Sequence, residues 1–198
     1  MTKYDFFPGK NVEQMQLLLK KGFEPLSMYD LVVKRLNVLG TYEEDLWWNT
    51  DFDTINGCVY YLDFSFKIVH DADFLKKMNK KTNLLNGSVI LNNDLEGKVF
   101  IREEHIFNRN LSFEEAKVHE CWIDFLRGNT KVLSDYVDAV WTKTDTGQVI
   151  NNNMGIFLAP PEELLTGCAW HLSSINKHSD VGGDFYLNYE NGLLVGKK

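Results

Sequence analysis

The sequence predicts an α+β fold in which a mainly antiparallel sheet, built from hairpins, is flanked by helices and preceded by an N-terminal helical pair. Segments of alternating apolar residues occur in pairs around turn-forming residues, which is typical of hairpins. Segments with apolar residues three and four apart separate these pairs, which is typical of amphipathic helices. Strands that come in hairpins, and not singly between helices, favour an antiparallel sheet over a parallel βαβ arrangement.

The composition indicates a globular protein with a substantial core. Of its 198 residues, 44% are hydrophobic and 13% are aromatic, and each buried aromatic side chain removes about 150–250 Å² from water. This length fits one domain with a small appendage. We expect residues 1–50 to be an N-terminal helical segment packed on the core and residues 51–198 to form the α+β domain.

Two short helices are predicted near the N-terminus. The first, NVEQMQLLLKKG, starts at Asn11 and carries its apolar residues on one face. The second, SMYDLVVKRLNVLG, starts with a capping box, in which Ser27 and Asp30 satisfy free backbone N–H groups reciprocally. The pair is expected to form an αα-hairpin. A helix-turn-helix that contacts DNA through residues 11–39 is the third functional hypothesis, although this region offers few polar contacts.

The middle of the chain predicts strands. Residues 41–57 read as an acidic, aromatic transition that ends in a turn. In CVYYLDFSFKIV (58–69), one alternating face is wholly apolar, which predicts one long half-buried strand. A short helix is expected in DADFLKKMNKK (71–81). Residues 88–107 then predict two strands of a hairpin around a loop rich in Asn, Asp and Gly.

The C-terminal half predicts helices followed by strands. SFEEAKVHECWIDFLRGN (112–129) and NTKVLSDYVDAVWTKT (129–144) each predict one helix. GIFLA (155–159) predicts a buried strand, and PPEELLTGCAWHL (160–172) a helix that begins with proline. The last segment, DFYLNYENGLLVG (184–196), predicts a hairpin.

The helix predicted over 112–129 carries the candidate catalytic residues. Glu115 and His119 are four residues apart and therefore neighbours on a helix, at the edge of its apolar stripe. A carboxylate that orients an imidazole can serve as a general acid/base pair. Ser112 and Glu115 also fit a capping box, which explains Glu115 without any catalytic role. Position 123 is Ile, so the H-E-x-x-H zinc-protease pattern is absent.

The first functional hypothesis is an intracellular binding or interaction protein without its own catalytic machinery. The aromatic content exceeds what one core needs, and the surplus would form a surface for a protein partner or a second copy of the chain. Core packing is the alternative for each of these side chains. The aromatic candidates are Trp47, Trp48, Tyr61 and Trp170, and the expected binding residues are Trp122, Trp170 and His171.

The second hypothesis is a hydrolase-type enzyme that uses the Glu115 and His119 pair. Asp63 or His105 would assist this pair as a further polar group. Whether the chain is an enzyme is left open by the sequence, because the cysteines and the remaining carboxylates fit no catalytic motif.

Charge and composition argue against several other classes. The net charge is −7, whereas binding to a nucleic-acid backbone needs a positive surface, so a nucleic-acid partner is disfavoured. Glycine motifs that bind phosphate are absent, and no set of metal ligands is complete, so we expect no cofactor and no metal. No apolar run reaches the ~20 residues that span a bilayer. Without a secretory signal, and with three widely separated cysteines, a reducing, cytoplasmic location is expected.

Overall fold

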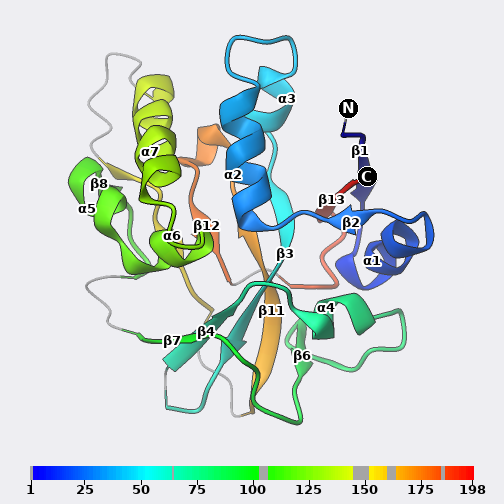
Figure 1. Cartoon of the computed structure of the whole chain (residues 1–198). Helices are drawn as coiled ribbons and strands as arrows, with labels where there is room; N and C mark the ends of the chain where they lie inside the picture. Colours follow the sequence, from blue (N-terminus) through cyan, green and yellow to red (C-terminus); the bar gives the residue numbers. More distant parts are fainter. Residues whose placement is uncertain (1, 64, 103–106, 145–151, 160–163, 184–185) are drawn as a thin grey trace.

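The structure is a computed structural model, and it confirms the predicted α+β class with a mostly antiparallel sheet. Figure 1 shows strands β3 and β11 crossing the centre of the molecule, with the N- and C-termini side by side at one edge. The described residues are 2–63, 65–102, 107–144, 152–159, 164–183 and 186–198.

The helices of the described residues are short, apart from α7. They are α1 (Asn11–Lys20), α2 (Met28–Asn37), α3 (Glu44–Trp48), α4 (Asp73–Lys77), α5 (Phe113–Val118), α6 (Glu120–Phe125), α7 (Thr130–Thr144) and the 3-10 helix η1 (Ile175–Lys177). The predicted α1, α2 and α7 are confirmed. The capping box of α2 is also present, since the Asp30 N–H donates to the Ser27 hydroxyl at 3.2 Å and the Ser27 N–H to the Asp30 carboxylate at 3.0 Å.

Most strands of the described residues belong to one sheet. They are β1 (Tyr4–Pro8), β2 (Glu24–Pro25), β3 (Phe52–Tyr60), β4 (Ser65–Val69), β5 (Leu84–Leu85), β6 (Ser88–Ile90), β7 (Lys98–Ile101), β8 (Leu111–Ser112), β9 (Asn152–Asn153), β10 (Ile156–Phe157), β11 (Thr166–Leu172), β12 (Val181–Gly182) and β13 (Leu193–Lys197). The main path runs β1-β13-β3-β11-β12-β10, and β4 pairs with β3 and β7 at one end. Strands β8 and β9 form a separate pair.

The first 50 residues supply strands as well as helices. β1 pairs antiparallel with β13, from Tyr4 opposite Lys197 to Pro8 opposite Leu193, and β2 pairs with the same strand. The N-terminal segment therefore contains two strands in addition to the expected helical pair. β1 pairs along one side of the final strand, whereas β2 and β3 share its other side, and this pairing holds the two termini together.

The core consists of two clusters, one on each face of the sheet. In β3, Cys58 and Tyr60 belong to the larger cluster, which also contains the side chains of α2, α6 and α7. Val59 belongs to the smaller cluster, beneath α1 and α4. Successive side chains of a strand point to opposite faces. The central strands β3 and β11 are therefore buried on both faces, not on one as the alternating pattern of 58–69 predicted.

Residues 58–69 form a hairpin and not one long strand. The chain leaves β3 after Tyr60 and returns in β4 from Ser65. The Asp63 carboxylate accepts hydrogen bonds from the Ser65 N–H at 3.0 Å and from its hydroxyl at 2.6 Å. Such side-chain-to-backbone bonds favour a turn over an extended strand. The turn predicted at the end of residues 41–57 is also wrong, because the residues from Phe52 onward already belong to β3.

Three further sequence-based elements differ from the structure. The helix predicted over 160–172 is the strand β11 from Thr166 onward, because non-local pairing with β3 along its length outweighs local helix propensity; residues 160–163 lie outside the described residues. The predicted hairpin over 88–107 is absent, since β6 pairs with β5 and β11, and β7 pairs with β4. In the last segment, β13 forms, but its partners are β1, β2 and β3.

The helix predicted over 112–129 is interrupted at His119. The backbone of His119 is extended, with φ −68° and ψ 123°, so that α5 ends before it and α6 begins after it. The expected capping box at Ser112 and Glu115 is confirmed. A helical wheel drawn through this break places the later residues wrongly, and Val118, expected on the buried face, is 70% exposed.

Candidate functional site

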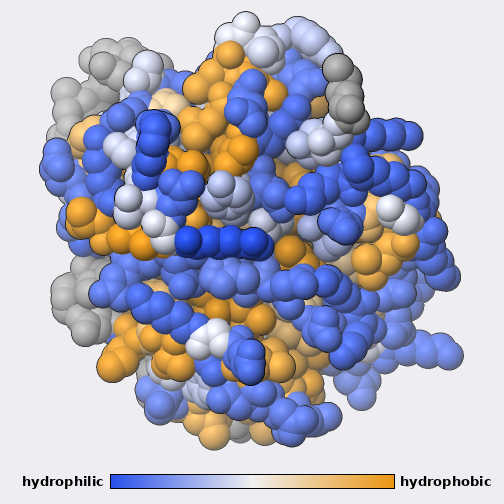
Figure 2. Space-filling model, in the orientation of Figure 1, coloured by the Kyte–Doolittle hydropathy of each residue, from blue (hydrophilic) through white to orange (hydrophobic). Residues whose placement is uncertain are grey.

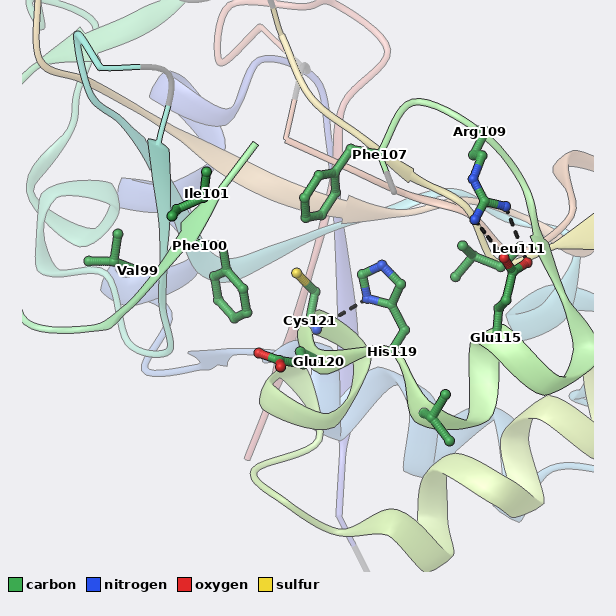
Figure 3. A pocket seen from close by; sticks show the side chains of 11 residues that line it. Val99, Phe100, Ile101, Phe107, Arg109, Leu111, Glu115, His119, Glu120 and Cys121 are labelled. Atoms are coloured by element: carbon green, nitrogen blue, oxygen red, sulfur yellow. Dashed lines mark hydrogen bonds and ion pairs between the residues drawn. The ribbon is translucent and has the colours of Figure 1, made fainter. Parts of the chain in front are cut away.

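A hollow of about 450 Å³ lies between strand β7 and helices α5 and α6. Figure 3 shows its side chains converging from β7, from Phe107 and from the two helices. Its walls are formed by Val99, Phe100, Ile101, Phe107, Arg109, Leu111, Glu115, Val118, His119, Glu120 and Cys121. We call it the β7–α5 hollow. Its volume and mainly apolar lining are typical of a binding site.

The rim of the hollow carries exposed apolar side chains. Val99 is 53% exposed and Ile101 74% exposed on β7, and Val118 is 70% exposed at the end of α5. Phe100, between the first two, is buried and stacks on Phe66 at 5.3 Å. Figure 2 shows hydrophobic surface over the part of the molecule where Figure 1 places β4 and β7. Apolar side chains gathered around a concavity indicate an interaction site.

Strand β7 also offers unpaired backbone groups along one edge. It pairs with β4, and within the described part of the chain no strand lies on its other side. The Tyr61 N–H donates to the Ser65 carbonyl, which fixes the alternation of hydrogen-bonded pairs in β3, β4 and β7. In this alternation Phe100 directs its N–H and C=O to Phe66 of β4. The N–H and C=O groups of the residues on either side of Phe100 therefore point away from the sheet.

At one end of the hollow, Glu115 is held by an ion pair and by its own helix. Its carboxylate accepts hydrogen bonds from the Arg109 guanidinium at 2.6 and 3.2 Å and from the Ser112 N–H at 2.7 Å. The bond from Arg109, followed by those from Ser112, lowers the pKa of Glu115 to about 2. The carboxylate therefore stays ionised, and its charge is matched by a neighbouring cation.

His119 lines the hollow as the N-cap residue of α6. Its Nδ1 accepts the Cys121 N–H at 3.2 Å, and its ring meets the Phe107 ring edge-on at 5.7 Å. Figure 3 shows the His119 ring turned toward Cys121 and Phe107, and the Glu115 carboxylate turned toward Arg109. The two candidate catalytic residues thus line one hollow but are oriented by different partners. Their role as an acid/base pair stays a prediction.

At the other end, Glu120 forms an ion pair with Lys98, at 2.9 Å. The bond to Glu120 raises the pKa of Lys98, so its ammonium group remains charged. Both charged pairs at the hollow are therefore neutral overall. A ligand in the hollow meets apolar surface between two self-compensated ion pairs, which does not favour a net charge of either sign.

The expected binding residues lie elsewhere. Trp122 and Trp170 are fully buried in the larger core cluster; the Trp122 indole N–H donates to the Met154 carbonyl at 2.8 Å, and Trp170 packs edge-on against Phe125 at 4.9 Å. His171 is buried in β11. In this structure none of the three presents a surface to a partner. Core packing also accounts for Trp47 and Trp48, which are 1% exposed, whereas the fourth aromatic candidate, Tyr61, is only partly buried.

The polar groups named for the other hypotheses are also engaged. Arg35 of α2 is fully buried, and Lys34 forms an ion pair with Glu43 at 2.5 Å. These contacts leave the second N-terminal helix without the basic face that a DNA-binding helix needs. The Asp63 carboxylate binds Ser65 in the β3–β4 turn. His105 lies outside the described residues.

The residues that form the rim were missed at the sequence level. The alternation of Val99, Phe100 and Ile101 was recognised as a strand, but the exposure of its outer face follows from the position of β7 at the sheet edge. Val118 was assigned to the buried face of a continuous helix. The extended backbone at His119 could not be anticipated from helix periodicity.

The described residues contain no group of three or more His, Cys, Asp and Glu side chains arranged to hold a metal ion. Within the same ranges, every helix is too short or too polar to cross a bilayer.

Comparisons with known proteins identify a fold but no family. No known protein family and no curated protein matches the sequence. One solved structure comes from work on how the C-type lectin fold accommodates massive sequence variation in Nanoarchaeota. It superposes on this chain with a TM-score of 0.68. The match covers 100% of this chain and 98% of the other at 15% sequence identity. This chain is therefore similar in fold to a C-type lectin-fold protein.

Proposed function

We propose that this protein is a binding protein whose β7–α5 hollow takes up an extended, apolar segment of a protein partner. The single observation that carries the proposal is the coincidence of an open strand edge with exposed apolar side chains at a hollow of about 450 Å³. The similarity to a C-type lectin-fold structure supports a binding role by analogy of fold alone. Glu115 and His119 belong to the wall of this site.

The strand edge favours an extended peptide as the occupant. The outward backbone groups of Val99 and Ile101 can pair with an added strand, as in β-strand addition. Natural proteins usually protect such edges with prolines, bulges or inward charges. β7 has none of the first two, and its one charged residue, Lys98, is engaged by Glu120. An edge left open in this way is suited to receive another chain.

The side-chain environment favours apolar residues in that peptide. Alternate residues of an added strand point to the same side, so every second side chain would face the hollow. There it would meet Phe107, Leu111 and Val118, with a neutral ion pair on either side. A segment with apolar residues at alternate positions and no net charge fits this arrangement.

A displayed library of linear random peptides tests the proposal. The wild-type protein is expected to enrich peptides with alternating apolar residues, and Ile101→Asp to weaken their binding at least about ten-fold, since a carboxylate would be placed against apolar surface. Leu46→Asp is the matched control, because Leu46 is also exposed but lies on α3. It should bind the same peptides as wild type.

Two outcomes would contradict the proposal. One is a selection without enrichment, and the other is a set of peptides that binds Ile101→Asp as well as wild type. Light scattering on the free protein measures its oligomeric state, and it shows whether a second copy of the chain occupies the hollow in place of a partner segment. A stable dimer that dissociates in Ile101→Asp would mean that β7 pairs with its equivalent and not with a partner segment.

A further inference from the structure

Two of the three cysteines lie opposite each other on the central strands of the sheet. Cys58 of β3 and Cys168 of β11 are directly paired in the antiparallel register. Neither forms a disulfide in the structure, and both are almost completely buried. Directly opposite residues of an antiparallel pair have their side chains on the same face, and both cysteines belong to the larger core cluster.

The Cα separation of this pair lies within the range that disulfides span. The Tyr61 N–H donates to the Ser65 carbonyl, so Cys58 directs its own backbone groups toward β11. Cys58 and Cys168 are therefore a hydrogen-bonded pair, with Cα atoms about 5.5 Å apart. Disulfides most often join residues whose Cα atoms are separated by about 5.5–6 Å and whose Cβ atoms lie about 3.5–4.5 Å apart. The Cβ atoms of a hydrogen-bonded pair lie about 5.5 Å apart, so closure of the disulfide requires the two strands to move slightly closer together at this point.

Both sulfur atoms lie against the same residue, Gly183. The Cys168 thiol donates to the Gly183 carbonyl at 2.6 Å. A Cβ atom added to Gly183 would lie 2.8 Å from the Cys58 Sγ, which is closer than any real contact. Glycine at this position therefore lets the chain pass directly over the two thiols, and both sulfurs share one small compartment.

We propose that Cys58 and Cys168 form a redox-sensitive dithiol that closes to an intramolecular disulfide in the presence of a peroxide. One cysteine thiolate attacks the peroxide O–O bond and becomes a sulfenic acid, releasing one water molecule when the peroxide is hydrogen peroxide. The second thiol attacks the sulfenic sulfur, forms the S–S bond and releases the sulfenic oxygen as a second water. Two thiols are oxidised and one peroxide is reduced to two waters.

The surrounding groups tolerate the loss of the thiol protons. The Gly183 carbonyl loses its bond from Cys168 but keeps a hydrogen bond from the Tyr60 hydroxyl, at 2.7 Å. Burial raises the pKa of Tyr60 well above 10, which keeps the phenol protonated and able to donate. The Gly183 carbonyl therefore still has a donor when the disulfide forms.

Access to the thiols requires only a local opening. The neighbouring strand β12, Val181–Gly182, is buried but is joined to β11 through two residue pairs, and a local opening costs less free energy than unfolding of the whole protein. A small oxidant can enter through such an opening, whereas a bulky alkylating reagent would react slowly with the folded protein.

Cys121 provides an internal comparison. It is also fully buried, but it lies in α6 and is not paired with another cysteine in the described strands. Burial, reinforced by the nearby Asp124, raises the pKa of Cys121 well above its usual value. Cys121 is therefore expected to remain a thiol under conditions that oxidise the pair.

Oxidation of the folded protein with hydrogen peroxide, followed by denaturation and alkylation, tests the proposal. The reduced chain has three cysteines to alkylate, whereas the oxidised wild-type chain should have one, and peptide mapping should link Cys58 to Cys168. The disulfide should also raise the unfolding temperature by roughly 5–10 °C. Cys121→Ser should show the same link and the same shift.

Single substitutions of the pair complete the test. Cys58→Ser and Cys168→Ala should each show no intramolecular disulfide after oxidation and no shift of the unfolding temperature. Three alkylated cysteines in oxidised wild type, or a link that involves Cys121, would overturn the proposal. The measurement on the wild-type protein alone decides whether Cys58 and Cys168 form a disulfide, so a variant that fails to fold does not affect the test.

Discussion

In the network around Arg35 a permanently charged side chain is fully buried, whereas at the β7–α5 hollow three apolar side chains are largely exposed. Each region reverses the usual distribution of polar and apolar groups. Inside the protein, hydrogen bonds satisfy the donors of the buried Arg35 guanidinium. At the hollow the described residues leave the apolar rim uncovered, and we infer that a partner covers it.

The Arg35 network joins segments that are far apart in the sequence. Its four hydrogen-bond acceptors among the described residues are neutral. Two belong to α3 and α7, one lies just after α3, and one lies just after η1. They are the Trp47 carbonyl at 2.9 Å, the Thr50 carbonyl at 3.0 Å, the Tyr136 hydroxyl at 2.8 Å and the Ser179 hydroxyl at 3.1 Å. A guanidinium can satisfy such a spread of acceptors because its donors are fixed in one plane.

Loss of the Arg35 guanidinium should give the largest change in stability. Arg35→Met leaves several buried acceptors without a donor, which should lower the free energy of unfolding by about 3–5 kcal/mol. Urea denaturation measures this change. Lys131→Met is the control, because Lys131 is exposed and its ion pair with Asp135 should contribute less than about 0.5 kcal/mol. Equal effects of the two substitutions would mean that the Arg35 network does not stabilise the fold.

A partly buried carboxyl in the same part of the molecule, that of Asp180, should make stability depend on pH. Burial raises the pKa of Asp180 to about 7. The hydrogen bond that its carboxylate accepts from the Gly155 N–H, at 2.6 Å, lowers the pKa and offsets part of this rise. The folded protein therefore binds this proton more tightly than the unfolded chain, whose pKa is near 3.8. This contribution to stability is fully present below about pH 4 and is lost as the pH rises toward 7.

Asp180→Asn should remove this pH dependence. The amide keeps an oxygen for the Gly155 N–H but carries no charge, so the variant should be more stable than wild type by about 2 kcal/mol at pH 8 and equal to it near pH 4. Thermal unfolding of both proteins across this range gives the difference. A difference that is constant with pH would show that Asp180 titrates normally in the folded state.

The wall of the hollow should be less sensitive than the Arg35 network. Ser112→Ala removes the hydroxyl that caps α5 through the Glu115 N–H, and the expected loss is about 1 kcal/mol. Ser112→Thr should restore most of it, because threonine also caps helices. Chemical denaturation of the three proteins checks this order, and a loss as large as that of Arg35→Met would contradict it.

The rim of the hollow should give the smallest change in stability. Val99→Thr and Val118→Asp alter side chains that are mostly in water already, so each should change the free energy of unfolding by less than about 0.5 kcal/mol. The aspartate variant should nevertheless lose binding of a selected peptide at least about ten-fold. If both variants unfolded much more easily than wild type, the rim would be a part of the core and not a binding surface.

Local signals explain which parts of the fold could be predicted. The helices α1, α2 and α7 follow from apolar spacing, and both capping boxes follow from a hydroxyl three residues before an acid. The α+β class follows from the change between the two periodicities. These features depend on residues within one or two turns of each other, so their physical causes are visible in the sequence.

Non-local pairing explains most of what could not be predicted. The segment that became β11 starts after two prolines and reads as a helix, but its pairing with β3 fixes it as a central strand. Trp122 and Trp170 were expected at a surface, since the size of the two core clusters was not visible in the composition.

The candidate site was predicted only in part, for the same reason. Glu115 and His119 were singled out and do line the hollow. The rim residues Val99, Ile101 and Val118 were not, because their exposure depends on the sheet edge and on the helix break at His119.

Amide hydrogen exchange of β7, measured by NMR with and without a peptide from the library selection, tests the proposed binding mode most directly. The Val99 and Ile101 N–H groups point away from the sheet, so they should exchange rapidly in the free protein and at least about ten-fold more slowly in the complex. Phe100, whose N–H is bonded within the sheet, should be protected in both. Unchanged exchange at Val99 and Ile101 in a saturated complex would contradict strand addition at β7.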